Sequence, residues 1–166
     1  MKLIVAVDKN WGIGYQNKLL LSIPEDMKFF RKMTMEQVVV MGRKTLESFP
    51  NGKPLKNRIN VVLTRDREYT AEGAIIVHST EELYSVLKSY HQDSIYVIGG
   101  DSIYHLLLDS CDIAYITRIN QEFQADAWFP NLEEDPDWIL ADAGETLEDN
   151  GIFYRFQRYE KKGEND

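Results

Sequence analysis

Short runs of apolar and β-branched residues recur along the chain, separated by polar segments. Six of them occupy residues 3–7, 38–41, 59–63, 74–77, 95–98 and 113–117. Continuous apolar runs of this length are typical of strands buried on both faces, as in a mainly parallel sheet. Segments with helical spacing lie between them, at 25–33, 44–49, 80–90 and 102–108. This alternation predicts an α/β domain with helices on both faces of the sheet.

The pattern changes after Thr117. Residues 138–141 and 153–159 are predicted to be further strands, and the second alternates between apolar and polar positions. A polar, glycine-containing connection at 145–151 favours an antiparallel pair at one edge of the sheet. Residues 161–166 are charged and are predicted to form a tail. We therefore expect one domain over residues 1–160.

Composition and charge exclude several classes of protein. The chain has 166 residues and a formal net charge of -8, which argues against sequence-independent binding to nucleic acid or anionic membranes. Cys111 is the single cysteine, so an intrachain disulfide is impossible and a reducing cytoplasm fits. The first apolar run is too short for a signal peptide or a membrane span. The three histidines are scattered without neighbouring ligands, so no metal site is expected. We expect a cytoplasmic monomer.

Asp26 is a carboxylate at a position where a helix usually buries an apolar group. Ile23, Met27, Phe30 and Met33 form one apolar stripe at helical spacing, and Asp26 lies at its edge. Partial desolvation there should raise the pKa of Asp26, as happens at many functional sites. Alternatively, Asp26 merely complements the helix dipole. The position of Asp26 alone leaves both interpretations open.

Two strand-to-helix turns could hold phosphate groups. One contains Gly99 and Gly100 after an apolar strand, and glycines let the backbone approach an anion at a helix start. The other contains Gly42 with Arg43, Lys44 and Thr45, but lacks a glycine that a Walker A loop requires. Each turn, taken alone, could be an ordinary turn.

A third cation, Arg65, follows the next apolar strand. The carboxyl ends of parallel strands share one edge of a sheet, and ligands bind there in open α/β folds. Two glycine turns and several cations on that edge suit a dinucleotide with an extra phosphate, so NADPH fits better than NADH. Residues 11–15 contain two glycines but no third glycine and no helix start, so the dinucleotide fingerprint is absent. We interpret them as a flexible loop able to close over a ligand.

Several ordered segments from Leu3 to about Tyr159 resemble the bacterial dihydrofolate reductase family. They are Ile4-Val5-Ala6-Val7, Gly12-Ile13-Gly14 with Asn17, Ile23-Pro24-Glu25-Asp26 with Phe30, Val40-Met41-Gly42-Arg43-Lys44-Thr45 with Glu47-Ser48, Pro54-Leu55 with Arg58 and Asn60, Val97-Ile98-Gly99-Gly100 with Tyr104, Tyr115-Ile116-Thr117, and Asp126 with Phe129-Pro130. The resemblance implies an eight-stranded, mostly parallel sheet with an antiparallel C-terminal edge and four flanking helices. It also implies hydride transfer from NADPH to 7,8-dihydrofolate, giving 5,6,7,8-tetrahydrofolate.

The resemblance also assigns roles to individual residues. Asp26 would bind the pterin, Thr117 would hydrogen-bond its carboxylate, and Leu21 would occupy the adjacent catalytic position. Arg58 would pair with the glutamate tail of the substrate. The other substrate-binding candidates are Ile4, Ala6, Met27, Phe30, Arg31, Phe49, Lys53, Leu55, Ile98 and Tyr104. The cofactor-binding candidates are Ala6, Ile13, Gly14, Asn17, Lys18, Leu19, Gly42, Arg43, Lys44, Thr45, Leu63, Thr64, Arg65, His78, Gly99, Gly100, Asp101, Ser102, Ile103 and Tyr104.

The chain departs from the family pattern in three places. Leu21 stands where the family has a tryptophan, which removes an indole donor from the site. Asp126 has alanine neighbours in place of glycine and threonine, which puts its contact with the loop at 12–19 in doubt. An extra residue lies within 49–54. Two alternatives remain: a pyrimidine reductase of riboflavin synthesis, which shares the fold and NADPH, and a folate- or nucleotide-binding protein with impaired turnover.

Overall fold

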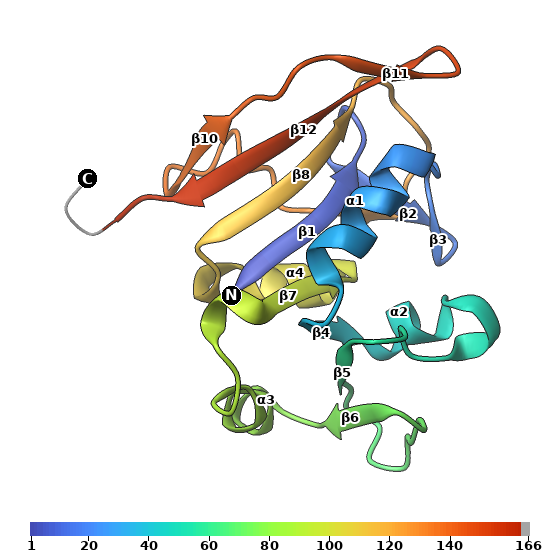
Figure 1. Cartoon of the computed structure of the whole chain (residues 1–166), viewed down its shortest axis with the longest axis vertical. Coiled ribbons are helices and arrows are strands. Elements are labelled where there is room, and N and C mark those ends of the chain that lie inside the picture. The colour runs from blue at the N-terminus through green and yellow to red at the C-terminus, as the bar shows by residue number, and fades with distance from the viewer. Residues whose placement is uncertain (164–166) are drawn as a thin grey trace.

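Eight strands form the continuous path of a nine-stranded, twisted sheet in the computed structural model, which describes residues 1–163 (Figure 1). Their order is β10-β12-β8-β1-β7-β4-β5-β6. The strands are β1 (Lys2–Val7), β4 (Val38–Gly42), β5 (Ile59–Leu63), β6 (Ala74–Val77), β7 (Ile95–Gly99), β8 (Ile113–Ile119), β10 (Trp138–Asp142) and β12 (Ile152–Lys161). The helices are α1 (Pro24–Thr34), α2 (Arg43–Glu47), α3 (Thr80–Leu87) and α4 (Asp101–Leu107).

The sheet is parallel through its centre and antiparallel at one edge. β1 lies between β7 and β8 and runs parallel to both, and β4, β5 and β6 continue in the same sense. β12 runs antiparallel to both β8 and β10. The predicted fold class and its C-terminal antiparallel edge are therefore confirmed.

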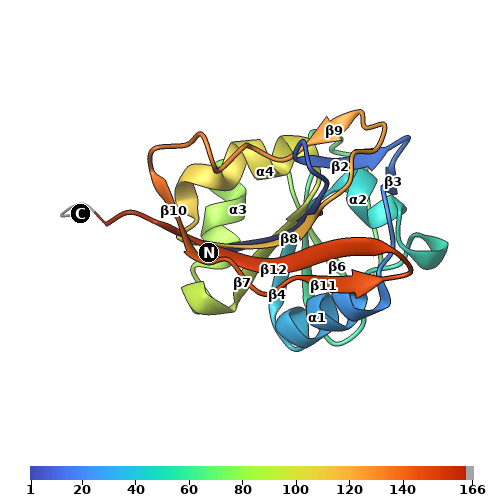
Figure 2. The ribbon, with the colours of Figure 1, turned by 90° about the horizontal axis from the view of Figure 1, so that it is seen from above.

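Helices cover both faces of the sheet (Figure 2). On one face, Phe29 of α1 packs against Phe156 and Tyr115, with ring centroids 4.8 Å and 6.2 Å away. On the other face, α4 places Tyr104 and Leu107 in the main apolar core. Phe29 lies outside the apolar stripe predicted for α1, whereas Met27, a member of that stripe, is 49% exposed. The contact of α1 with the sheet through Phe29 was therefore not anticipated by the predicted stripe.

A second, smaller sheet was not predicted. It has the order β3-β2-β9 and consists of β2 (Gly12–Tyr15), β3 (Lys18–Leu19) and β9 (Ala127–Trp128). The interpretation of residues 11–15 as a loop alone is corrected, because Gly14 pairs with both Leu19 and Ala127. β11 (Leu147–Asp149) also lies in the predicted polar connection and pairs with β12.

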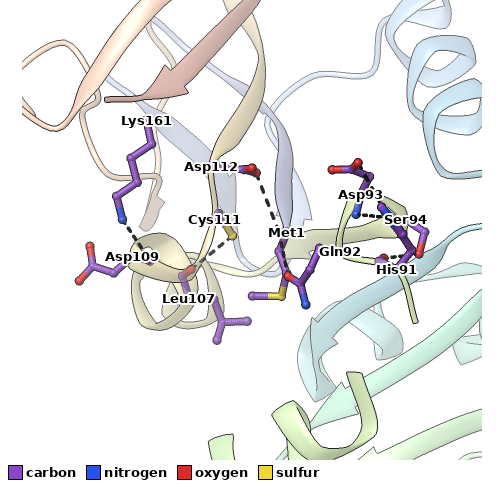
Figure 3. A network of polar contacts seen from close by, with 10 residues as sticks. All are labelled: Met1, His91, Gln92, Asp93, Ser94, Leu107, Asp109, Cys111, Asp112 and Lys161. Atoms are coloured by element: carbon purple, nitrogen blue, oxygen red, sulfur yellow. Dashed lines mark hydrogen bonds and ion pairs between the residues drawn. The ribbon is translucent and has the colours of Figure 1, made fainter. Parts of the chain in front are cut away.

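A network of polar contacts surrounds the start of β1 (Figure 3). The N-terminal ammonium donates to Gln92 Oε1 at 3.3 Å and lies 3.9 Å from Asp112 Oδ1. The buried Cys111 thiol donates to the Leu107 carbonyl at 3.3 Å, and burial raises its pKa to about 12. Lys161 Nζ donates to the Asp109 carbonyl at 2.7 Å. Cys111 is therefore a structural thiol at neutral pH.

The C-terminal tail expected at residues 161–166 begins within β12. The backbone N–H groups of Lys161 and Lys162 donate to the carbonyls of Asp112 and Asp137. Residues 164–166 lie outside the described part of the chain. Among residues 1–163, no helix combines the length and apolar character needed to cross a membrane.

Candidate active site

Asp26 lies in the first turn of α1, on the face of the helix that approaches β8. The Thr117 hydroxyl donates to Asp26 Oδ1 at 2.6 Å. Thr117 is buried in β8 and lies opposite Ala6 on one side and Phe156 on the other. Burial raises the pKa of Asp26, and the weaker effect of the Thr117 bond lowers it. Desolvation therefore dominates at Asp26, as its place beside the apolar stripe predicted.

Tyr104 of α4 is bonded to β1 and lies near the Asp26 carboxylate. The Tyr104 hydroxyl donates to the Ile4 carbonyl at 2.7 Å. Burial raises the pKa of Tyr104, and the nearby charge of Asp26 raises it further. Tyr104 is therefore a neutral hydrogen-bond donor within electrostatic reach of Asp26.

The apolar candidates divide between two clusters. Ala6 and Leu21 pack against a cluster built on Ile23, Ile119 and Tyr154. Phe49, Leu55 and Ile98 pack against a second cluster, formed by Val39, Met41, Leu46 and Val62. Leu21 thus fills the position of the family's tryptophan as an apolar packing residue, with no polar atom to offer.

Arg58 is partly buried near a second cation. Its Nη1 donates to the Lys56 carbonyl at 3.2 Å, whereas its buried Nε has no partner within residues 1–163. Burial lowers the pKa of Arg58, and the positive charge of Arg31 lowers it further. Two cations and an unused buried donor form an arrangement that an anionic group would stabilise. Lys53, the third cation expected here, is exposed.

Asn60 holds the turn that presents Arg58. Its Oδ1 accepts from the Leu55 N–H at 3.0 Å, and its Nδ2 donates to the carbonyls of Leu55 and Arg58 at 3.0 and 3.1 Å. Asn60 is buried at the start of β5. In the sequence, Asn60 belongs to one of the family-like segments and has no assigned role. The signal for its positioning role is a buried polar residue in an apolar strand.

The structure brings the two glycine turns together. Gly99 and Gly100 are joined by a cis peptide bond. A Cβ atom added at Gly100 would lie 3.4 Å from Thr45 Oγ1, and one at Gly42 would lie 3.1 Å from Ile103 Cγ1. The Gly100 carbonyl accepts from the N–H groups of Ile103 and Tyr104 at the start of α4. The absence of side chains at Gly42 and Gly100 therefore lets the two turns approach each other.

The cations of this edge are not equivalent. Arg43 is engaged within the protein, because its Nε and Nη1 lie 2.9 Å from carboxylate oxygens of Glu47 and Asp66. Lys44 and Arg65 are exposed. Arg43 is therefore already paired with carboxylates, whereas no ion pair holds Lys44 or Arg65 within residues 1–163; the assignment of all three to the cofactor phosphates stays a prediction.

Thr64 and His78 lie side by side next to Arg65. The Nδ1 atom of His78 is 3.0 Å from the Thr64 carbonyl oxygen, and the His78 N–H donates to Glu82 Oε2 at 2.7 Å. Leu63 pairs with Val77 in the adjoining strands. The ends of β5 and β6 thus form a fixed platform beside the exposed guanidinium of Arg65.

The β2–β3 hairpin is tied to the same edge. Asn17 Nδ2 donates to the Lys44 carbonyl at 3.3 Å. Asp126 Oδ2 accepts from the Gln16 N–H at 3.0 Å, and the Asp126 N–H donates to the Gly14 carbonyl at 3.0 Å. The contact put in doubt by the alanine neighbours of Asp126 is therefore present.

The remaining cofactor candidates lie on two elements. Ile13, Lys18 and Leu19 belong to the hairpin, while Asp101, Ser102 and Ile103 open α4. Asp101 also joins α4 to β9, the strand that pairs with β2, since its Oδ2 accepts from the Trp128 N–H at 3.0 Å. Among the described residues, no group of three histidine, cysteine or acidic side chains is placed to hold a metal ion.

A parallel sheet with two glycine turns and free cations at its carboxyl edge, beside a desolvated carboxylate, defines a nucleotide-dependent α/β enzyme. A sequence model described as dihydrofolate reductase matches residues 1–161. The chain belongs to the dihydrofolate reductase family. It is thereby an NADPH-dependent oxidoreductase by family.

Individual relatives match over nearly the whole chain. Dihydrofolate reductase of Staphylococcus aureus strain Mu50 is 36% identical over 158 residues, which cover 94% of each protein. Dihydrofolate reductase of Bacillus subtilis strain 168 is 36% identical over 161 residues, covering 96% of this chain and 93% of that protein. The structure of Enterococcus faecalis dihydrofolate reductase complexed with NADP(H) and RAB-propyl superposes with a TM-score of 0.87 at 31% identity, covering 98% and 96% of the two chains.

Proposed function

We propose that this chain transfers a hydride from NADPH to 7,8-dihydrofolate, with Asp26 as the group that binds the pterin and supports its protonation. The observation that carries the proposal is the half-buried Asp26 carboxylate, whose pKa is raised and which accepts a hydrogen bond from Thr117. Bound NADPH supplies the hydride. A carboxylate that retains a proton above the usual range can support protonation of the pterin N5 near neutral pH.

The residues around Asp26 fix its geometry. Thr117 occupies one carboxylate oxygen at 2.6 Å, which leaves Oδ2 for the amino group and ring N–H of a pterin. Met27 and Phe30 follow Asp26 on the same helix and offer an apolar surface to the rings. Leu21 contributes packing in place of an indole donor. Hydride transfer depends mainly on holding the two reacting rings at contact distance, so we expect Leu21 to be compatible with turnover.

An assay of NADPH oxidation at 340 nm tests this function directly. The chain should oxidise NADPH only when dihydrofolate is present. A pyrimidine reductase would require a substrate with a ribose phosphate, and a binding protein with impaired turnover would bind both ligands without oxidising NADPH. Either of those results would contradict the proposal.

The glutamate tail of the substrate is proposed to bind at Arg58, with Arg31 and Lys53 nearby. The unpartnered Nε of Arg58 and the neighbouring charge of Arg31 support this assignment. Arg58→Ala should raise the Michaelis constant for dihydrofolate about 10-fold to 100-fold, because a charge-assisted pair is worth roughly 1.5–3 kcal/mol. A pterin without glutamate should be unaffected, and Lys56→Ala is the matched control. Equal losses with both substrates would show that Arg58 acts through the fold.

The adenosine phosphates are proposed to bind at the carboxyl edge, and Arg65 with Lys44 is proposed to set the preference for NADPH. Arg65→Ala should raise the Michaelis constant for NADPH about tenfold and leave that for NADH nearly unchanged, because one charge-assisted contact is lost. Arg67→Ala removes the same charge two residues away and serves as the control. Equal losses with both cofactors would place Arg65 away from the 2′-phosphate.

We further propose that the enzyme acts as a monomer in a reducing cytoplasm, without nucleic acid or membrane partners. The net charge of -8 and the free, buried Cys111 support this proposal. Light scattering of the purified protein at micromolar concentration tests the monomer, since a mass near twice 19.3 kDa would contradict it.

A further inference from the structure

A groove of about 400 Å³ lies over β8 and β12, which run side by side in Figure 1. Lys9, Arg118, Glu133, Phe153, Arg155 and Gln157 contribute to its lining. Thr117 and Arg118 are consecutive in β8, so their side chains point to opposite faces of the sheet. The groove therefore lies across the sheet from Asp26 and takes no part in the proposed reaction. Its volume is within the range of small-molecule sites, roughly 300–1,000 Å³.

The groove concentrates positive charge in an acidic protein. Arg118 and Arg155 lie directly opposite each other in the antiparallel register of β8 and β12. Like charges in directly opposed positions destabilise a sheet unless an anion compensates them. Glu133 compensates Arg118 at 2.6 Å. Within residues 1–163, neither Arg155 nor Lys9 forms an ion pair with a carboxylate.

One of these cations is already held in a fixed position. The Arg118 guanidinium lies 4.4 Å from the centroid of the Trp11 ring, and its Nη2 donates to the Lys9 carbonyl at 2.8 Å. A ligand that binds beside Arg118 therefore needs to order mainly Arg155 and Lys9, which keeps the entropic cost of binding low.

The rest of the lining suggests the other parts of a ligand. Phe153 is 46% exposed and lies opposite Asn120 at the end of the groove. An exposed aromatic ring favours a ligand with a flat apolar body.

We infer that this groove is a second ligand site, which binds a small aromatic anion. The carboxylate or phosphate of the ligand lies between Arg155 and Lys9 beside Arg118, and its ring lies on Phe153. The site stands independently of the proposed catalytic function, because no residue lining it is assigned to substrate or NADPH.

The experiment uses the full chain saturated with NADP⁺ and folate, so that the proposed catalytic site cannot take up the probe. 4-Hydroxybenzoate and phenyl phosphate are titrated while the side-chain amide of Gln157 and the indole N–H of Trp11 are followed by NMR. Neutral 4-hydroxybenzamide has nearly the same shape and serves as the ligand control. We expect saturable shifts with at least one anion and none with the amide; the tighter of the two anions identifies the preferred acid group.

Two arginines of β12 provide matched variants. Arg155→Leu should weaken binding of the anion about tenfold, as expected for loss of one charge-assisted contact. Arg158→Leu removes the same charge from the same strand, but Arg158 lies opposite Tyr115, on the other face of the sheet. It should leave the affinity within about twofold.

The stability of Arg155→Leu separates loss of the site from loss of the fold. Because this variant removes one of two opposed like charges, its melting temperature should not fall below that of the parent chain. Lys9→Ala is the second test and should also weaken the anion. The inference is overturned if neither anion gives saturable shifts, if 4-hydroxybenzamide binds as well, or if the Arg155 and Arg158 variants lose affinity equally.

Discussion

Asp8 and Asp26 are both removed from solvent, yet their surroundings differ in kind. Asp8 follows β1, is 2% exposed, and its carboxylate accepts three backbone N–H groups, from Asn10, Gly12 and Phe123, at 2.8, 2.8 and 3.0 Å. Asp26 is less buried, but within residues 1–163 its carboxylate accepts only the Thr117 hydroxyl. Burial raises the pKa of Asp26.

The comparison indicates that the supply of hydrogen-bond donors, more than depth of burial, distinguishes the structural carboxylate of Asp8 from that of Asp26, which is proposed to bind the pterin. The donors around Asp8 are fixed backbone groups that tie the start of β2 and the segment near Phe123 to the end of β1. Asp26 keeps one oxygen without a donor and lies at the edge of an apolar helix face. A partly buried carboxylate with too few donors lowers the stability of the folded protein when it is ionised. A ligand that supplies the missing donors restores that stability.

The largest expected effect is loss of turnover at Asp26. Asp26→Asn should lower hydride transfer at neutral pH by roughly 100-fold to 10,000-fold, the usual contribution of a positioned acid or base. NADPH binding should be retained, since the phosphate-binding edge is untouched. Single-turnover measurement of NADPH oxidation checks the first point and NADPH fluorescence checks the second. Near-normal turnover across pH would remove Asp26 from its assigned role.

The same variant sharpens the comparison through its stability. Because the folded state raises the pKa of Asp26, its protonated form is favoured on folding. The contribution of this raised pKa to stability is fully present below the pKa that Asp26 has in the unfolded chain. It is lost as the pH rises through the pKa that Asp26 has in the folded protein. At pH 7, Asp26→Asn should therefore melt at a higher temperature than the parent chain, and at pH 4 the difference should shrink. A lower melting temperature at pH 7 would contradict this reasoning.

Asp8→Ala should have the opposite profile. The substitution leaves three N–H groups without their acceptor, and we expect the free energy of unfolding to fall by about 3 kcal/mol. Urea denaturation measures the loss. The folded fraction should retain turnover far better than Asp26→Asn does. A stable but inactive Asp8→Ala protein would contradict the assignment of a structural role to Asp8 and a functional role to Asp26.

Thr117→Val should produce the smallest change and a specific one. The Thr117 bond lowers the pKa of Asp26 against the larger effect of burial, so its removal should raise that pKa further. The pH at which the hydride-transfer rate falls should then rise by on the order of one unit, because the ionised form of Asp26 loses one hydrogen bond. Thr117→Ser should restore the original profile. An unchanged pH profile in Thr117→Val would show that Thr117 does not influence the pKa of Asp26.

Sequence patterns predicted the elements whose causes are local. Six of the eight strands on the main path are predicted from continuous apolar runs, and β12 is predicted from its alternation of apolar and polar residues. The position of Asp26 is indicated by its spacing to Phe30 and Met33, which places a polar group beside an apolar stripe. Thr117 lies 91 residues away from Asp26, and no periodicity connects them; its role came from the family resemblance. The burial of Asp8 was not anticipated.

The missed features depend on distant partners. β2, β3 and β9 are too short to show a period, and their pairing is set by contacts such as Gly14 with Ala127. Arg43 looked like a phosphate ligand beside Gly42, but its pairing with Asp66 is visible only once β4 and β5 are adjacent. Local spacing indicates which residue types are available, whereas tertiary neighbours decide which of them remain free.

The central position of β1 has a consequence for how the chain is made. Lys2 pairs with Tyr96 and Ile113, so β1 leaves the ribosome well before β7 and β8, its neighbours in the sheet. At roughly 5–20 residues per second, the interval between the synthesis of β1 and that of β7 lasts about 5–20 seconds. Throughout it, the apolar run of β1 is available to chaperones or to other nascent chains. Because the partner of Asp26, Thr117, lies in β8, a product that ends before β8 would lack this hydrogen bond, and activity should appear only after β8 has been synthesised.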